Sequence, residues 1–132
     1  MNSLEKIVGG TAIVTGASSG IGEVYADRLA SLGHDLVLVA RREDRLRQLA
    51  TRLEERFGVR AAVLVADLSQ PRGVSAVAER VARDSSVTLL VNNAGFSALR
   101  PLTRTSDETI SSMIALNVTA MTLLSKIGRA HV

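Results

Sequence analysis

The sequence predicts an α/β fold in which helices cover both faces of a parallel sheet. Short, nearly continuous apolar runs recur four times, and each is followed by a segment whose apolar residues have helical spacing. The connections are short, and the first is rich in glycine. This alternation is typical of a Rossmann-type doubly wound parallel sheet. We expect the sheet to be truncated after the fourth strand and its following helix.

The first two strands are expected at residues 11–15 and 36–40. A glycine-rich loop leads into the first helix, which should end before Gly33, and the second helix should end before Gly58. Each of these helices has an apolar stripe at helical spacing. The expected stripes are Ile21, Val24, Tyr25, Leu29 and Leu32 in the first helix, and Leu46, Leu49, Leu53 and Phe57 in the second.

The third and fourth strands are expected at residues 61–66 and 87–91. Ser69 is predicted to cap the third helix, and Pro71 suits its first turn. Ser106 is predicted to cap the last helix. The expected inner stripes are Val74, Val77, Ala78 and Val81 in the third helix, and Ile110, Met113, Ile114, Val118 and Met121 in the last.

The composition is that of an ordinary globular domain and excludes several classes of protein. Apolar residues make up 46% of the 132 residues and charged residues 22%. The absence of cysteine excludes disulfides and thiolate metal sites, and we expect no metal. The net charge of +3 is modest and the helix at 45–56 mixes both signs, which argues against nucleic acid. No apolar run approaches the roughly 18 residues of a membrane span, and no signal peptide is evident, so a cytoplasmic location is expected.

The loop from Thr15 to Gly22 has the features of a phosphate-binding turn between a buried strand and a helix. Gly16 permits a tight turn, Gly20 lets the backbone approach a pyrophosphate, and Gly22 lets the helix pack closely. The helix start presents free N–H groups to an anion, and two serines can add hydroxyl donors. The predicted contacts from this loop are Gly16, Ser18, Ser19, Gly20, Ile21 and Gly22.

Two other nucleotide-binding classes fit this loop poorly. A P-loop requires a lysine and a serine or threonine after its last glycine, but Gly20 is followed by Ile21 and Gly22. An S-adenosylmethionine enzyme would place an acid at the end of the second strand, where this chain has Ala40 followed by Arg41. The loop therefore indicates a dinucleotide site.

Three further sequence motifs follow the loop in order: Asp67-Leu68 after the third strand, Asn92-Asn93-Ala94-Gly95 after the fourth, and Asn117 in the last helix. With the Thr-Gly-x-x-x-Gly-x-Gly spacing, they make the chain closely resemble the short-chain dehydrogenase/reductase family. The resemblance implies that Asp67 and Leu68 contact adenine, and that Asn93, Ala94 and Gly95 border the adenosine and the nicotinamide-side ribose. It also implies that Asn117 is the catalytic asparagine, which supports a proton relay.

Each of these motifs could instead have a structural role with no part in cofactor binding or catalysis. Asp67 could be a helix-entry residue, and Asn92-Asn93 could form a turn that tolerates left-handed backbone. Asn117 lies on the apolar stripe and could instead hold its helix against the fourth strand. We weigh the structural and relay roles of Asn117 equally.

The residues after the second strand favour NADP over NAD. An acid there would bind the ribose hydroxyls of NAD, whereas a cation accommodates a 2′-phosphate. Ala40 offers no carboxylate, and Arg41 and Arg42 offer two guanidinium groups. Alternatively, both arginines are the solvated start of the next helix, partly compensated by Glu43 and its neighbour.

The family uses a tyrosine and a lysine four residues later for proton transfer, and the chain contains no such pair. Its one tyrosine is Tyr25, which we interpret as a packing residue, and no tyrosine precedes Lys126 at that spacing. We expect the N-terminal part of an oxidoreductase that interconverts a carbonyl and an alcohol, inactive alone, whose parent takes a small-molecule substrate and is a homo-oligomer. The alternatives are a non-catalytic dinucleotide-binding module and a database fragment with no independent function.

The sequence is expected to divide into a partial dinucleotide-binding domain at 1–126 and a non-native tail at 127–132. The apolar stripe of the last helix is broken by the final hexapeptide, Ile-Gly-Arg-Ala-His-Val. One reading frame of a widely used sequencing adapter encodes this hexapeptide. The hypothesis predicts that the same six codons are missing from the source genome at this locus.

Overall fold

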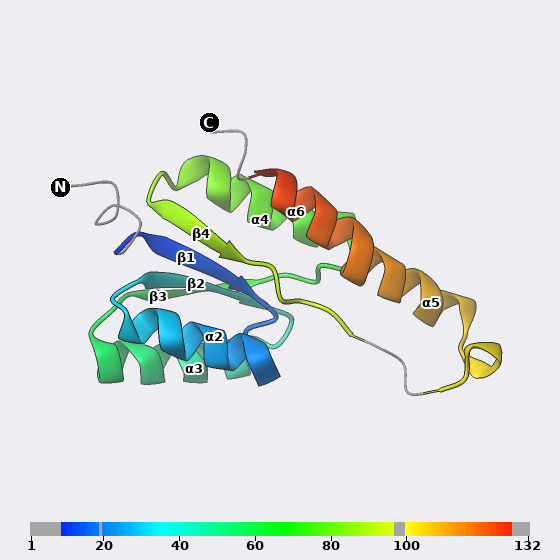
Figure 1. The fold of residues 1–132 in the computed structure, drawn as a ribbon, viewed down its shortest axis with the longest axis horizontal. Helices are drawn as coiled ribbons and strands as arrows, with labels where there is room; N and C mark the ends of the chain where they lie inside the picture. The colour runs from blue at the N-terminus through cyan, green and yellow to red at the C-terminus, as the bar shows by residue number, and fades with distance from the viewer. Residues whose placement is uncertain (1–8, 19, 97–99, 128–132) are drawn as a thin grey trace.

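A computed structural model describes residues 9–18, 20–96 and 100–127 of the chain. Its four strands form one parallel sheet in the order β3-β2-β1-β4 (Figure 1). The strands are β1 (Thr11–Thr15), β2 (Asp35–Ala40), β3 (Ala61–Val65) and β4 (Val87–Val91). The predicted fold class is confirmed: this is the first half of a Rossmann-type sheet, with β1 at the point where the strand order reverses.

Helices cover both faces of the sheet (Figure 1). On one face lie α2 (Gly20–Ser31) and α3 (Glu43–Phe57). On the other lie α4 (Pro71–Arg83) and a long helical stretch made of α5 (Asp107–Ile114), η2 (Ala115–Ala120) and α6 (Met121–Ile127). A short 3₁₀ turn, η1 (Leu102–Arg104), precedes α5.

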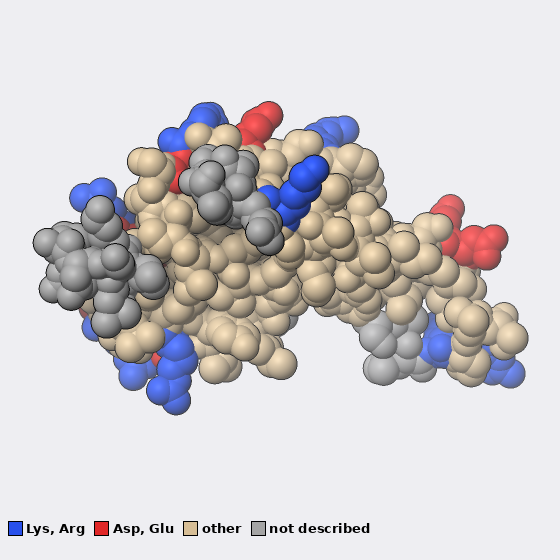
Figure 2. Space-filling view, turned by 45° about the horizontal axis from the view of Figure 1, so that its top comes forward, with Lys and Arg blue, Asp and Glu red and all other residues tan. Residues whose placement is uncertain are grey.

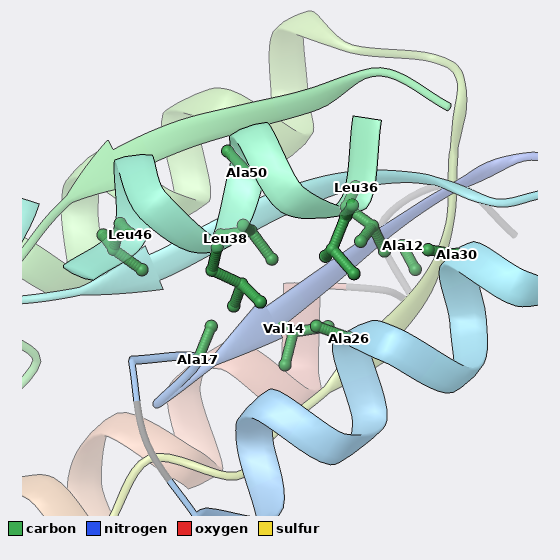
Figure 3. Close-up of a cluster of buried hydrophobic side chains, with 11 residues drawn as sticks. Ala12, Val14, Ala17, Ala26, Ala30, Leu36, Leu38, Leu46 and Ala50 are labelled. Carbon is green, nitrogen blue, oxygen red and sulfur yellow. The ribbon is translucent and has the colours of Figure 1, made fainter. Parts of the chain in front are cut away.

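The two central strands are buried on both faces because their side chains alternate between two hydrophobic clusters. Ala12 and Val14 of β1 face α2 and α3 (Figure 3), whereas Ile13 between them faces α4 and α6. Every residue of β1 is buried. A nearly continuous apolar run is the pattern that such a two-sided position requires.

The predicted inner stripe of α2 is wrong. The residues of α2 that are buried are Gly22, Ala26 and Ala30. Because this face lies close to the sheet, it accommodates only small residues, whereas a stripe chosen by hydrophobicity selects the largest ones. Of the predicted residues, only Leu29 packs against the core; the exposed fractions are 67% for Ile21, 63% for Leu32, 61% for Val24 and 47% for Tyr25. Tyr25 is therefore not the packing residue that the sequence suggested.

The predicted stripe of the last helix is wrong in its second half. Ala120 and Leu124 are buried and Leu116 packs against the same cluster, whereas Ile114 and Val118 are more than half exposed. Met121 is exposed as well. The reason is that the helix carries two apolar stripes, and Leu116, Ala120, Leu124 and Ile127, spaced four, four and three residues apart, form the one that faces the core.

The helix caps agree with the sequence at two positions and differ at a third. Ser106 caps α5 by accepting a hydrogen bond from the Thr109 N–H, as predicted. Pro71 occupies the first turn of α4, also as predicted. Ser69 does not cap α4, because the N-cap position belongs to Gln70, which makes no side-chain cap bond. The hydroxyl of Ser69 instead donates to Asp67.

The stretch from Asp107 to Ile127 is long and apolar enough to cross a membrane by length and composition alone, with a mean hydropathy of 1.4. The expectation that no stretch is long and apolar enough was therefore wrong. Figure 2 shows the uncharged surface that extends toward the protruding tip. Leu124 on this stretch is fully buried against the core, whereas only 11% of the most apolar 18-residue window is buried.

Ile127, the first residue of the expected tail, is the last residue of α6 and packs against the core. Residues 128–132 lie outside the described residues. The proposed boundary at 126 stays a prediction.

Candidate functional site

A cavity of about 730 Å³ lies at the carboxyl edge of the sheet, around the point where β1 neighbours both β2 and β4. In open α/β sheets the strand order reverses at such a point, and loops on either side diverge to leave a crevice for a ligand. Most of the predicted site residues line this cavity: Gly16, Ser18, Ile21, Arg41, Arg42, Asp67, Leu68, Asn93, Ala94 and Gly95.

Two predicted loop residues are not among the described lining residues. Gly20 is the exposed first residue of α2, and an added Cβ there would meet nothing within 4 Å. Gly22 is buried beneath the loop, where an added Cβ would lie 2.0 Å from the Gly16 carbonyl oxygen. Ser19 lies outside the described residues. The open space at Gly20 and the close contact at Gly22 suit the approach and packing roles predicted from the sequence.

Thr15 connects the loop to the end of β4 and was missed by the sequence analysis as a functional residue. Its hydroxyl accepts hydrogen bonds from the Asn93 and Ala94 N–H groups, both at 3.0 Å, and donates to the Val91 carbonyl at 3.3 Å. The side chain is fully buried. A threonine at the end of an otherwise apolar strand was the available signal, since a buried hydroxyl requires partners.

The two neighbouring asparagines point to different elements. The Asn93 side chain donates to the Gly16 carbonyl at 3.3 Å, so it supports the glycine loop. Asn92 donates to the Met121 carbonyl at 2.8 Å and to the Ser125 hydroxyl at 3.1 Å, so it anchors α6. Among the described residues only glycines have positive φ, which contradicts the interpretation of Asn92-Asn93 as a left-handed turn.

Asn117 holds the backbone of Phe96 with both ends of its amide. Its side-chain nitrogen donates to the Phe96 carbonyl at 2.7 Å, and its oxygen accepts from the Phe96 N–H at 3.0 Å. Phe96 lines the cavity, whereas Asn117 is absent from the described lining residues. These contacts support the structural interpretation of Asn117, and the relay role stays a prediction.

Asp67 presents a carboxylate at the cavity wall. Its Oδ1 accepts hydrogen bonds from the Ser69 hydroxyl at 2.6 Å and from the Ser69 N–H at 3.0 Å. The hydroxyl bond lowers the pKa of Asp67, and although partial burial opposes this, the Ser69 N–H and the charge of Arg41 lower it further. The α4 cap is Gln70, so Asp67 is not the helix cap itself.

Arg41 and Arg42 lie exposed on the cavity wall at the end of β2. The ion pairs of the described residues involve other arginines. Glu43, a residue expected to compensate them, pairs instead with Arg47 one turn along α3, at 3.0 Å. Within the part of the chain that the structure describes, neither guanidinium group is held in an ion pair, so both can bind an anion.

Part of the cavity wall comes from residues that the sequence did not predict. Ser69 and Gln70 follow Asp67, and Phe96 follows the glycine of the fourth-strand motif. A further part comes from α5 and η2, namely Glu108, Thr109, Ser112 and Leu116. Nothing local in those helices marks them, because only the packing of α5 beside the sheet brings them to the cavity.

The comparisons with known proteins agree with this geometry. The family model described as short chain dehydrogenase matches residues 10–131. The chain is 33% identical over 123 residues to a human protein named inactive hydroxysteroid dehydrogenase-like protein 1, covering 92% of this chain and 37% of that protein. It spans between 34% and 40% of the length of the curated relatives that it matches.

Two solved structures are similar over 92% of the chain. One is the bulky-bulky ketone specific alcohol dehydrogenase from Comamonas testosteroni, with 41% identity and a TM-score of 0.90 over 49% of that protein. The other is a short-chain dehydrogenase from Sphingobium yanoikuyae in complex with NADPH, with 43% identity and a TM-score of 0.89 over 48% of that protein.

Proposed function

Because this chain belongs to the short-chain dehydrogenase family, whose members are oxidoreductases, we propose that it is the N-terminal cofactor-binding part of an NADP-dependent member. The parent protein would interconvert a carbonyl and an alcohol by hydride transfer. The chain would hold the dinucleotide without turning it over, since Tyr25 lies on α2 and is followed four residues later by Leu29 rather than lysine.

The observation that carries this proposal is the pair of exposed guanidinium groups at the end of β2. Arg41 and Arg42 line the cavity, Glu43 is engaged by Arg47, and Ala40 offers no carboxylate to a ribose. Two planar donors suit a phosphate, which they can bind in a bidentate manner. The complex of a 43% identical relative with NADPH supports the same cofactor.

The remaining cavity residues have proposed roles along the dinucleotide. The start of α2, with Ser18 beside it, would bind the pyrophosphate through N–H groups and the positive end of the helix dipole. Asp67 and Leu68 would contact adenine, and Asn93 to Gly95 would border the sugars. When bound, the dinucleotide would carry the hydride, which NADPH donates to a carbonyl and NADP⁺ accepts from an alcohol; the residues of this chain would bind it, orient it and exclude water.

Removal of the Arg41 guanidinium is expected to abolish the preference for the 2′-phosphate. Isothermal titration calorimetry of the chain should show NADP binding at least about tenfold tighter than NAD, because hydrogen bonds between charged groups contribute about 1.5–3 kcal/mol. Arg41→Ala should weaken NADP binding by about 10- to 100-fold and NAD binding by less than about threefold.

Arg45→Ala is the matched control, because Arg45 is exposed on α3 and is not among the lining residues that the structure describes. It should leave both affinities unchanged. If Arg41→Ala lowered the affinities for NADP and NAD by the same factor, the assignment of the 2′-phosphate site would be contradicted. No binding of either dinucleotide by the unmodified chain would contradict the proposed function itself.

A second candidate function is that of a module that binds the dinucleotide but catalyses no reaction with it. The observation that favours it is the similarity to a relative named as inactive. The full-length gene product, incubated with NADPH and a panel of bulky ketones, distinguishes the two candidates. Loss of NADPH absorbance at 340 nm supports the reductase, whereas saturable binding without consumption supports the module.

The substrate, assembly and location of the parent are also proposals. A small carbonyl or alcohol compound is the substrate class, supported by the ketone-specific relative with 41% identity. The parent would be a homo-oligomer in the cytoplasm and would not bind nucleic acid. Size-exclusion chromatography with light scattering of the full-length protein tests the assembly.

A further inference from the structure

A tight turn holds the carboxylate of Asp67 in place. Both the N–H and the hydroxyl of Ser69 donate to one oxygen, Oδ1. Among the hydrogen bonds and ion pairs of the described residues, none involves the second oxygen, Oδ2. Because Asp67 and Ser69 both line the cavity, the turn leaves one carboxylate oxygen free to accept a hydrogen bond there.

The backbone at Asp67 is already fixed, so the side chain is what Ser69 controls. Ala66 and Leu68 on either side are buried in the core, and the Ala66 N–H donates to the Ala40 carbonyl at 3.0 Å. The first turn of α4 also packs closely on this point, since a Cβ at Gly73 would lie 2.0 Å from the Asp67 carbonyl oxygen. The motion that remains open to Asp67 is mainly the rotation of its side-chain carboxylate.

The direction in which the Asp67 carboxylate points matters because Arg41 lies on the same cavity wall. Its positive charge acts on the Asp67 carboxylate across the cavity. A carboxylate released from Ser69 would be free to turn toward that guanidinium. Such a pair would remove an acceptor from the adenine side of the cavity and a donor from the phosphate side.

We propose that Ser69 is a positioning residue that holds Asp67 so that Oδ2 accepts a hydrogen bond from the exocyclic amino group of adenine. This inference rests on the proposed function, because it requires an adenine dinucleotide in the cavity. Ser69 thereby determines discrimination among purines rather than affinity for the pyrophosphate or the 2′-phosphate.

The chain contains a second copy of the same turn, which provides a matched control. The N–H and hydroxyl of Ser86 both donate to Oδ1 of Asp84, and Arg80 lies 3.7 Å from the other oxygen of that carboxylate. Ser86 precedes β4 and so lies at the opposite edge of the sheet from the cavity. Removal of its hydroxyl tests the loss of such a turn, together with the bond to the Thr11 hydroxyl, without any change at the cavity.

The experiment compares NADP with nicotinamide hypoxanthine dinucleotide phosphate, in which a carbonyl oxygen replaces the adenine amino group, by calorimetry on the chain. The unmodified chain should prefer NADP by about tenfold, as expected for a hydrogen bond to a charged acceptor. Ser69→Ala should reduce this preference to less than about twofold by weakening NADP alone. Ser69→Thr should restore it, and Ser86→Ala should leave it unchanged.

The possible outcomes separate the two proposals. Equal weakening of both dinucleotides by Ser69→Ala would overturn the positioning role, because a merely structural turn affects both alike. An unmodified chain that binds the two dinucleotides equally would overturn it as well, while leaving the proposed function intact. Failure of the unmodified chain to bind either one would overturn the proposed function and this inference with it.

Discussion

Gly22→Ala is expected to lower the free energy of unfolding by about 2 to 4 kcal/mol, although alanine is the better helix former. The Cβ would lie 2.0 Å from the Gly16 carbonyl oxygen and 2.6 Å from the Asn93 side-chain nitrogen. Both neighbours belong to the loop and strand ends that form the cavity, so α2 must move away. The helix start then no longer presents its N–H groups to the pyrophosphate, and NADP affinity should fall by more than about tenfold.

Urea unfolding followed by circular dichroism measures the first effect, and calorimetry with NADP measures the second. Gly58→Ala is the control, because an added Cβ there meets nothing within 4 Å and only the positive φ of 69° opposes it. We expect Gly58→Ala to cost about 1 kcal/mol and to leave binding unchanged. A gain of about 1 kcal/mol in Gly22→Ala, as helix propensity alone predicts, would contradict the close packing of α2 on the loop.

Thr15→Val is expected to destabilise the fold by about 1 to 3 kcal/mol while leaving the shape of the side chain nearly unchanged. The substitution removes the one described acceptor of the Ala94 N–H, whereas the Asn93 N–H and the Val91 carbonyl keep their mutual hydrogen bond at 3.1 Å. Each group left without a partner costs about 1–3 kcal/mol where water cannot reach it. Because Asn93 and Ala94 line the cavity, NADP binding should weaken as well.

Two substitutions calibrate this result. Thr15→Ser keeps the hydroxyl and should recover most of the lost stability. Thr11→Val makes the same change at the other end of β1, where the side-chain bond found among the described residues is to the exposed Ser86 hydroxyl, so it should cost only about 0.5–1.5 kcal/mol. Similar losses for Thr11→Val and Thr15→Val would show that the Thr15 hydrogen bonds do not carry the effect.

Much of the site was predictable because its residues follow strands. Gly16 follows β1, Arg41 follows β2, Asp67 follows β3 and Asn93 follows β4. The carboxyl ends of parallel strands meet at one edge of the sheet, so residues far apart in sequence converge there once the strand pattern is recognised. The cavity lined by these residues is the outcome.

The helix faces were predicted less well, for two physical reasons. The buried face of α2 is made of Gly22, Ala26 and Ala30, and small residues give no hydrophobic signal even where the helix packs most closely. In the last helix two apolar stripes lie side by side, and the stripe of Leu116, Ala120 and Leu124 faces the core whereas Val118 and Met121 are exposed, so hydrophobicity alone did not select the buried face.

The sequence by itself determined the strand pattern, the parallel sheet, the glycine loop and the two arginines after β2, because each depends on residue type and spacing along a short segment. Only the tertiary structure decided what the polar side chains do. Asn117 clamps Phe96, Asn92 anchors α6, and Ser69 holds Asp67 instead of capping α4. A hydrogen bond depends on which groups lie within about 3 Å of one another, and the packing of the helices on the sheet sets those distances.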